Sequence, residues 1–229
     1  MTDPDKPSDR GDQTRSALVQ AAMAEFSDNG YHAASNRDIA AQAQANQALI
    51  GYHFGGKQGL YLAVFQFISE QVQQHTGSVI AQMKARLGSL PEGEPLDAEA
   101  REACIQLVLG LVERMAKLFV SPLFKPAAQL ILREQQKPTQ AFDILYESFM
   151  RPSLQVVTAL VQRLRPKDSR EDAALLVITI LGQILIFRAG RSTALRHLAW
   201  EEIGPDQLAA ILKRVKTSTR LLLSTEDET

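Results

Sequence analysis

The chain has 229 residues, of which 45% are hydrophobic, so it can bury a sizeable core and form one or two domains. Its 25 Lys and Arg residues nearly balance 26 Asp and Glu residues, and the net charge of −1 excludes a protein that holds nucleic acid through a strongly basic surface. The single cysteine, Cys104, excludes an internal disulfide, is compatible with a reducing cytoplasm and is interpreted as a small buried apolar residue.

The first predicted helix follows a polar N-terminal arm. Residues 1–12 are rich in Asp and Pro and predict a disordered acidic arm, not a hydrophobic targeting segment. Residues 14–31 predict an amphipathic helix, with Leu18, Ala22 and Phe26 in line. Its C-terminal stop is expected at Gly30.

Two short helices around a tight turn are predicted within residues 35–57. Ile39 and Ala43 lie four positions apart, as do Ile50 and Phe54, so each short helix has one apolar stripe. Both stripes can pack on the helix that precedes them. The three segments together predict a helix-turn-helix, although an ordinary helical corner with a solvated face is the alternative.

The second short helix leaves one side without large aliphatic residues. Asn36 and Asn46 are expected to cap the two helices, which leaves room only for a turn between them. Small residues let a helix backbone approach the floor of a DNA groove, and the Gln47 amide can pair with a base edge, most naturally adenine. Tyr52, His53 and Lys57 can donate to phosphates. The free side of the helix carries Gln47, Ala48, Gly51 and Tyr52.

Helical periodicity continues to the end of the chain without any convincing strand. Proline marks several boundaries, because it suits the first turn of a helix and disrupts the interior. Pro138 is expected in a first turn, and Pro152 is expected to kink or split the helix that follows. Ser169 is expected to cap the next helix. The expected segments are helices over 57–87, 97–119, 127–136, from 138 onward, over 170–189 and from 205, with a loop over 88–95.

The strongest apolar run, residues 173–187, is interrupted by Gly182 and Gln183. It is shorter than the roughly 18–20 residues needed to span a bilayer, so it predicts a buried helix and no membrane segment. A helix that is apolar almost all round needs cover on several sides, which a partner subunit could provide. The alternative is that the run belongs to the core of its own chain. Residues 224–229 are expected to form a solvated tail.

Several motifs resemble those of the TetR family of bacterial transcriptional regulators. In chain order they are AAMAEFSDNGY at 21–31, RDIA at 37–40 and IGYHFGGKQGLY at 50–61. The segment LREQQKPTQAFD at 132–143 resembles the CerR/CecR-like subgroup. The resemblance implies an all-α fold of about nine helices. A three-helix DNA-binding domain at 13–56 would be joined by a long helix to an effector-binding and dimerisation domain at 57–223.

The same resemblance implies a cytoplasmic, ligand-responsive regulator, most often a repressor. It would bind a palindromic operator as a homodimer and be released by a small-molecule effector. The last two helices, at about 170–189 and 205–222, would pair with those of a second protomer. A two-fold dimer can place two reading helices in successive major grooves, about 34 Å apart. The expected DNA contacts are Asn36, Arg37, Gln47, Ala48, Gly51, Tyr52, His53 and Lys57.

A small-molecule pocket is also implied among the helices at about 57–165, and effector binding is expected to tilt the long helix that begins near Lys57. Arg133 and Glu134 could instead form caps or ion pairs, and Tyr146 could be a core residue with its hydroxyl in water. The candidate effector residues are Phe119, Arg133, Glu134, Phe142, Tyr146 and, from the dimer helix, Gln183 and Arg188.

Two positions depart from the pattern of the family. Gln44 stands where the family usually has Gly in the turn, and a non-glycine residue in the left-handed region costs about 1 kcal/mol or more, so a reshaped turn is one expectation. Gly51 stands where the family usually has Tyr. It weakens the reading helix by roughly 1 kcal/mol relative to Ala but permits closer contact with the groove.

Enzymatic function is not expected, because the sequence contains no Gly-x-Ser-x-Gly, His-Glu-x-x-His or Walker motif. Its four histidines are scattered, so no metal or cofactor is expected. The alternative to a DNA-binding regulator is a helical ligand-binding or scaffold protein without DNA binding.

Overall fold

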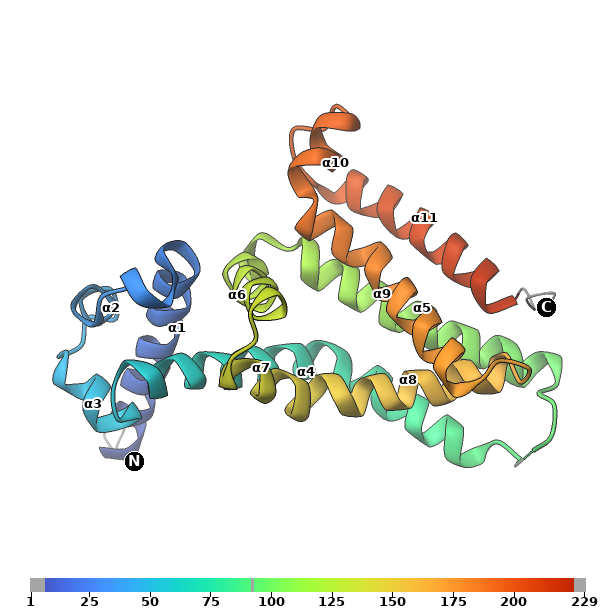
Figure 1. Cartoon of the computed structure of the whole chain (residues 1–229), viewed down its shortest axis with the longest axis horizontal. Helices are drawn as coiled ribbons and strands as arrows, with labels where there is room; N and C mark the ends of the chain where they lie inside the picture. The colour runs from blue at the N-terminus through green and yellow to red at the C-terminus, as the bar shows by residue number, and fades with distance from the viewer. Residues whose placement is uncertain (1–6, 92, 225–229) are drawn as a thin grey trace, which may run out of the picture. The chain divides into compact units, whose positions relative to one another are not determined.

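The computed structural model describes residues 7–91 and 93–224, and all regular structure in these ranges is helical (Figure 1). The expected all-α fold is therefore confirmed. The helices are α1 (Pro7–Ala33), α2 (Asn36–Gln42), α3 (Ala48–Phe54), α4 (Lys57–Ser89), α5 (Ala98–Val120), α6 (Lys125–Gln136), α7 (Gln140–Leu145), α8 (Arg151–Leu164), α9 (Arg170–Ala189), α10 (Arg191–His197) and α11 (Pro205–Ser224). A 3₁₀ turn at Pro122–Phe124 and a π-helical turn at Tyr146–Met150 complete the described elements.

The chain divides into two compact units. The first comprises the described residues up to Gln71 together with Pro126–Glu147, and the second comprises Val72–Lys125 together with the described residues from Ser148. The expected domain boundary at residue 57 does not coincide with this division. The first part of α4, with α6 and α7, belongs to the unit that contains the helix-turn-helix.

The core of the first unit contains the residues predicted for the first helix. Leu18, Ala22 and Phe26 are fully buried, and the Phe26 ring packs edge-on against Tyr61 of α4, with 5.0 Å between ring centroids. Gly30 interrupts α1 with φ 77° and ψ 168°, which confirms it as the expected stop.

Helix α1 begins earlier than expected. It starts at Pro7, so residues 7–12 are helical and the expected disordered arm is wrong for them. Proline suits the first helical position because its φ is preset to a helical value. Residues 1–6 of the expected arm and residues 225–229 of the expected tail lie outside the described residues.

The turn between α2 and α3 keeps the geometry that glycine usually provides. Gln44 has φ 51°, in the left-handed region. Its amide donates to the carbonyl of Ala41 (3.1 Å), and the amide of Ala45 donates to the carbonyl of Ala40 (2.9 Å). These two bonds form a Schellman motif, so Gln44 adopts the strained conformation and the turn is not reshaped.

The second unit is built around α5, α8, α9 and α11. Cys104 lies fully buried in its core, as expected. Asp97 caps α5 by accepting from the amide of Ala100 (2.7 Å), and Ser169 forms a capping box with Asp172 at the start of α9. The predicted starts of α5 and α9 are therefore confirmed.

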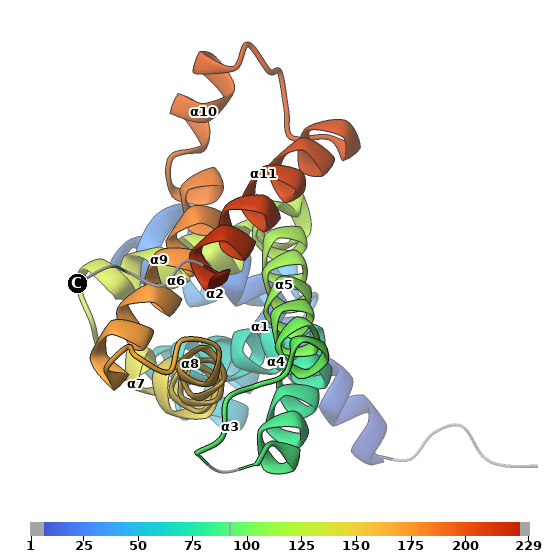
Figure 2. The same ribbon diagram turned by 90° about the vertical axis from the view of Figure 1, so that its right-hand side faces the viewer.

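Differences from the expected segments lie around prolines and after α9. Thr139, not Pro138, caps α7, and Pro138 precedes the cap. The predicted split near Pro152 is confirmed, because a π-helical turn ends at Met150 and Pro152 lies in the first turn of α8. Helix α10 was not predicted, and it extends away from the packed helices of its unit (Figure 2).

Replacing the strained residue of the turn tests its cost. We expect Gln44→Gly to raise the free energy of unfolding by about 1 kcal/mol, because glycine adopts the left-handed conformation without penalty. Urea unfolding followed by circular dichroism measures the change. The matched control is Gln42→Gly, an exposed glutamine within α2, which should lower stability by about 1 kcal/mol. A free energy of unfolding lower for Gln44→Gly than for wild type would contradict the interpretation that the Gln44 backbone is strained.

Candidate nucleic-acid interface

Helix α3 has one buried side and one exposed side. Ile50 is only 1% exposed and anchors the inner side, with Leu49, His53 and Phe54 partly buried beside it. Tyr52 is 82% exposed. The predicted division of the helix into two sides is confirmed. The exposed residues are Gln47, Ala48, Gly51 and Tyr52.

Neither predicted asparagine occupies the N-cap position of its helix, which is Gln47 at α3, but Asn46 still bonds to the start of α3. Asn46 Oδ1 accepts a hydrogen bond from the amide of Ala48 (2.9 Å). At α2, Ser35 occupies the N-cap position and Asn36 is the first helical residue, so the expected cap at Asn36 is wrong. Asn36 Oδ1 is buried and has no hydrogen-bond partner among the described residues.

The end of α3 approaches the start of α4 very closely. A Cβ atom on Gly59 would lie 1.8 Å from the carbonyl oxygen of Phe54, so only glycine fits there. Gly55 closes α3 with φ 71°. Gly59 lies within the motif at 50–61, but this role was not predicted. The available sequence signal for this close approach was Gly59 itself, which follows four residues after Gly55.

The cations near α3 have different tasks. Lys57 Nζ donates to the carbonyls of Ala34 (2.6 Å) and His32 (3.2 Å) and lies 5.1 Å from the Tyr31 ring centroid. Lys57 therefore links the start of α4 to the main chain at the end of α1. Most of its donor capacity is used within the protein. Arg37 is the more available cation, since its side chain is 84% exposed and its ion pair with a neighbouring carboxylate is long (3.5 Å).

A short helix with a polar exposed side, joined to another helix by the five residues 43–47 and packed with it on a third helix, is typical of a helix-turn-helix DNA-binding protein. The sequence matches the family described as "Bacterial regulatory proteins, tetR family" over residues 18–64. It matches "HTH-type transcriptional dual regulator CecR, C-terminal domain" over residues 104–225. The chain belongs to the TetR family of transcriptional regulators, in its CecR-like subgroup.

Relatives and solved structures agree with this assignment. The HTH-type transcriptional dual regulator CecR of Shigella flexneri is 32% identical over 219 residues, which cover 93% of each chain. A TetR regulator from Chloroflexus aurantiacus has a TM-score of 0.62 and 17% identity, with 95% of this chain and 98% of that chain covered. A TetR-family regulator from Mesorhizobium loti has a TM-score of 0.60 and 19% identity, with 94% and 97% covered. The two structures show the shared fold.

Four of the seven expected effector residues lie in the first unit. Arg133 donates to main-chain carbonyls of α1, and Glu134 accepts from Tyr61 and from the start of α7. Phe142 and Tyr146 stack on each other, with 5.9 Å between centroids. Arg133 and Glu134 therefore make the structural contacts that were the alternative to effector binding. Their bonds cap helix ends and are not ion pairs.

The other three expected effector residues lie in the second unit. Arg188 donates to the carbonyls of Phe119 (2.5 Å) and Ser121 (2.8 Å), and burial lowers its pKa. Gln183 accepts a hydrogen bond from the Ser218 hydroxyl, which links α9 to α11. The two polar candidates here are thus engaged in hydrogen bonds within their own unit.

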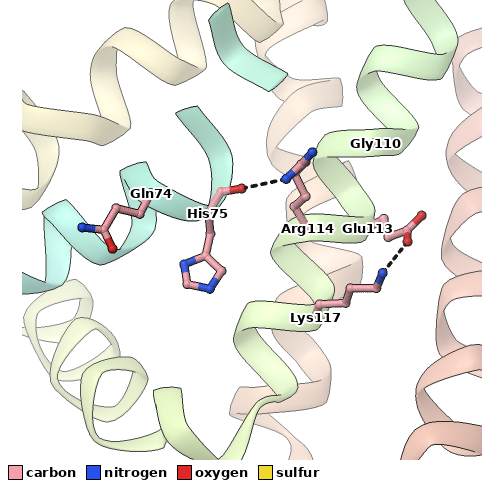
Figure 3. Close-up of a pocket in the computed structure, with 6 residues that line it drawn as sticks. All are labelled: Gln74, His75, Gly110, Glu113, Arg114 and Lys117. Atoms are coloured by element: carbon pink, nitrogen blue, oxygen red, sulfur yellow. Dashed lines mark hydrogen bonds and ion pairs between the residues drawn. The ribbon is translucent and has the colours of Figure 1, made fainter. Parts of the chain in front are cut away.

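A polar groove lies between α4 and α5 in the second unit (Figure 3). It has a volume of about 500 Å³ and includes none of the seven expected effector residues. Glu113 accepts from Lys117 (2.6 Å) and from Lys216 of α11, and these two ammonium groups lower its pKa to about 2. Arg114 makes only a long contact (3.4 Å) with the carbonyl of His75. The lining residues are Gln74, His75, Gly110, Glu113, Arg114 and Lys117.

The lining of this groove carries two cations, Arg114 and Lys117, and one carboxylate, Glu113. The Glu113 carboxylate is already paired with Lys117 and with Lys216 of α11. Gly110, Glu113 and Arg114 lie on one side of α5, but their spacing does not indicate that Gln74 and His75 of α4 complete a groove beside them.

The few available cations predict a weak dependence of DNA binding on salt. Among the described side chains, with Lys57 engaged internally, Arg15 and Arg37 are the exposed cations close to α2 and α3, and they would make four in the expected dimer. Four phosphate contacts correspond to a slope of about −4 in log K against log[salt]. Titrating labelled DNA at several salt concentrations measures it. A slope near −10 would contradict the prediction.

Proposed function

We propose that the protein binds a palindromic operator as a homodimer and represses transcription until a small-molecule effector releases it. The observation that carries this proposal is the exposed side of α3, where small and polar residues surround Gln47 and Tyr52. A groove floor can approach Ala48 and Gly51 closely because neither has a large side chain. Repression follows the majority of the family, and the Shigella flexneri relative is named a dual regulator.

Within this proposal, base reading and phosphate binding are separate tasks. Gln47 precedes the first turn of α3, where helix residues contact base edges in this class of protein. Arg37, in the first turn of α2, is expected to bind phosphate and fix the register. Tyr52 adds a phenolic donor at the exposed side.

Substitution of Gln47 tests the reading role. We expect Gln47→Ala to lower affinity for the selected operator by about tenfold and to relax sequence preference at two symmetry-related base pairs, because a bidentate amide contributes about 1–3 kcal/mol of discrimination. Selection of bound DNA from a random pool, with wild type and variant in parallel, measures both effects. The matched control is Gln20→Ala, an exposed glutamine of α1. A non-palindromic selected site, or equal preferences for wild type and Gln47→Ala, would contradict the proposal.

Dimerisation is proposed from the uncovered apolar residues of the last two long helices. Leu175, Ile178 and Ile186 of α9 are 56–60% exposed, and Leu221 of α11 is 61% exposed. The α9 residues repeat at helical spacing along one side. The opposite side of α9 belongs to the core of the unit. A second copy of the same two helices can cover this face and form the four-helix interface expected for residues 170–189 and 205–222.

A membrane is the other environment that could cover α9. Among the described residues, α9 is the helix long and apolar enough to cross a bilayer, and 28% of its apolar window is buried. However, its first turn carries a capping box, and Arg188 in its last turn bonds to carbonyls of the same unit. Val177, Ile180 and Ile184 face the core. These contacts favour a protein helix with one face left for a partner subunit.

A charge on the exposed face of α9 tests this interface. We expect Ile178→Asp to convert the dimer into a monomer, because the interface would have to bury an unpaired carboxylate. Operator affinity should then fall by at least about tenfold, since one reader binds alone. Sedimentation velocity measures the oligomeric state. The control is Leu123→Asp, at a leucine that is 91% exposed outside α9 and α11, which should remain dimeric. A dimeric Ile178→Asp protein would contradict the interface.

We propose that the effector binds in the groove between α4 and α5, because the residues that line this groove carry more positive than negative charge. A ligand that carries a carboxylate or phosphate would neutralise the excess positive charge around Arg114 and Lys117. It would release DNA only to the extent that it prefers the non-binding conformation, with a coupling of about 1–3 kcal/mol.

A further inference from the structure

We propose that Arg133 and Glu134 of α6 are positioning residues of the DNA reader. Together they join α6 and α7 to α1 and α4. We call these two residues and their four partners the brace: Arg133 with the carbonyls of Phe26 and Ser27, and Glu134 with Tyr61 and Thr139. The inference rests on the proposed DNA binding and adds the means by which the reader is held.

Arg133 binds the last turns of α1. Its Nη1 donates to the carbonyl of Phe26 (2.6 Å) and its Nη2 donates to the carbonyl of Ser27 (2.7 Å). These carbonyls lie just before Gly30 breaks the helix, where a helix end carries partial negative charge. The Ser27 hydroxyl adds a third link by donating to Gln129 of α6. A planar guanidinium with two parallel donors therefore fixes the direction of α6 against α1.

Glu134 binds α4 and α7 from the next position of α6. It is 3% exposed and accepts from the Tyr61 hydroxyl (3.0 Å), the Thr139 amide (2.8 Å) and the Thr139 hydroxyl (2.9 Å). Three donors make burial of the carboxylate tolerable. The Tyr61 ring also contacts Phe26 and Tyr31 of the α1 segment, each with 5.0 Å between centroids. The burial of Tyr61 and its bond to Glu134 raise the pKa of its phenol.

The importance of the brace follows from how the chain is connected. It passes between the two units three times, at residues 71–72, 125–126 and 147–148. The first passage lies within α4, and the other two lead into and out of the segment that carries α6 and α7. The brace joins α6 and α7, which lie between the second and third passages, to α1 and to the part of α4 that precedes the first passage.

Irregular backbone lies beside the second and third passages. A 3₁₀ turn ends at Phe124, just before the second, and the π-helical turn at Tyr146–Met150 contains the third. Gln73, just after the first passage, donates to the carbonyl of Ser148, just after the third (2.8 Å). π-helical turns occur often at functional sites. The segment that carries α6 and α7 is therefore bounded by irregular backbone at both of its ends.

The brace makes no contact with the exposed side of α3, so its loss should affect spacing more than base reading. We expect Arg133→Ala and Glu134→Ala to lower affinity for a correctly spaced palindrome by about tenfold while changing affinity for a single half-site by less than about twofold. Insertion of one or two base pairs between half-sites should penalise the variants less than wild type. Fluorescence anisotropy with these duplexes, derived from the selected operator, measures all three affinities.

Controls separate positioning from simple loss of folding. Gln136→Ala changes an exposed residue of the same helix and should behave as wild type. Arg133→Lys should restore only part of the affinity, because an ammonium lacks the two parallel donors. Equal losses for full and half sites would indicate fewer folded readers and would overturn the proposal, as would variants that match wild type on every duplex.

A second measurement does not depend on DNA. Hydrogen exchange in Arg133→Ala should accelerate at the amides of residues 26–34 but not at those of α3, and in Glu134→Ala it should accelerate at the start of α7. Unchanged exchange would overturn the brace even if DNA binding fell. If the wild-type protein bound no DNA in the random-pool selection, the proposed function would fail, while exchange would still decide whether the brace holds α1, α4 and α7 together.

Discussion

The orientation of α3 depends on one constraint: a seven-residue helix has a single side to bury. Ile50 supplies the fully buried side chain of that helix, and its burial turns the polar side outward. The bond from the Ala48 amide to Asn46 holds the start of the helix, and the absent side chain of Gly59 lets its end meet α4. These three local features are independent in chemistry yet agree on one orientation. That agreement makes the exposed side a defined surface rather than a mobile loop.

Features that depend on neighbouring residues were predictable from the sequence. The two sides of α3, the stop at Gly30 and the cap at Ser169 all follow from periodicity or capping within a few residues. The position of the turn was predictable. The strained left-handed conformation of Gln44 was not. The surrounding packing and the Schellman bonds outweigh a local penalty of about 1 kcal/mol.

Features that depend on distant partners were not predictable. Lys57 has the sequence setting of a phosphate ligand, but its ammonium reaches carbonyls 23 and 25 residues away. Arg133 was a candidate effector residue, yet its partners lie 107 and 106 residues earlier in the chain. Periodicity reports which side of a helix is apolar and carries no information about which carbonyl a long polar side chain reaches. The same limit explains why the groove beside Arg114 was missed.

A near-neutral DNA-binding protein must obtain its affinity from geometry. With few cations near α2 and α3, long-range attraction to phosphates is weak, so each reader alone contributes little. Two readers held at the spacing of successive major grooves multiply their affinities, but only while that spacing is maintained. A strongly basic protein could tolerate a loose connection, because diffuse attraction would persist at any angle. This chain lacks that reserve. Under the proposed function, the buried Glu134 and the paired donors of Arg133 would complement the low charge, because a rigidly held reader would compensate for weak electrostatic attraction.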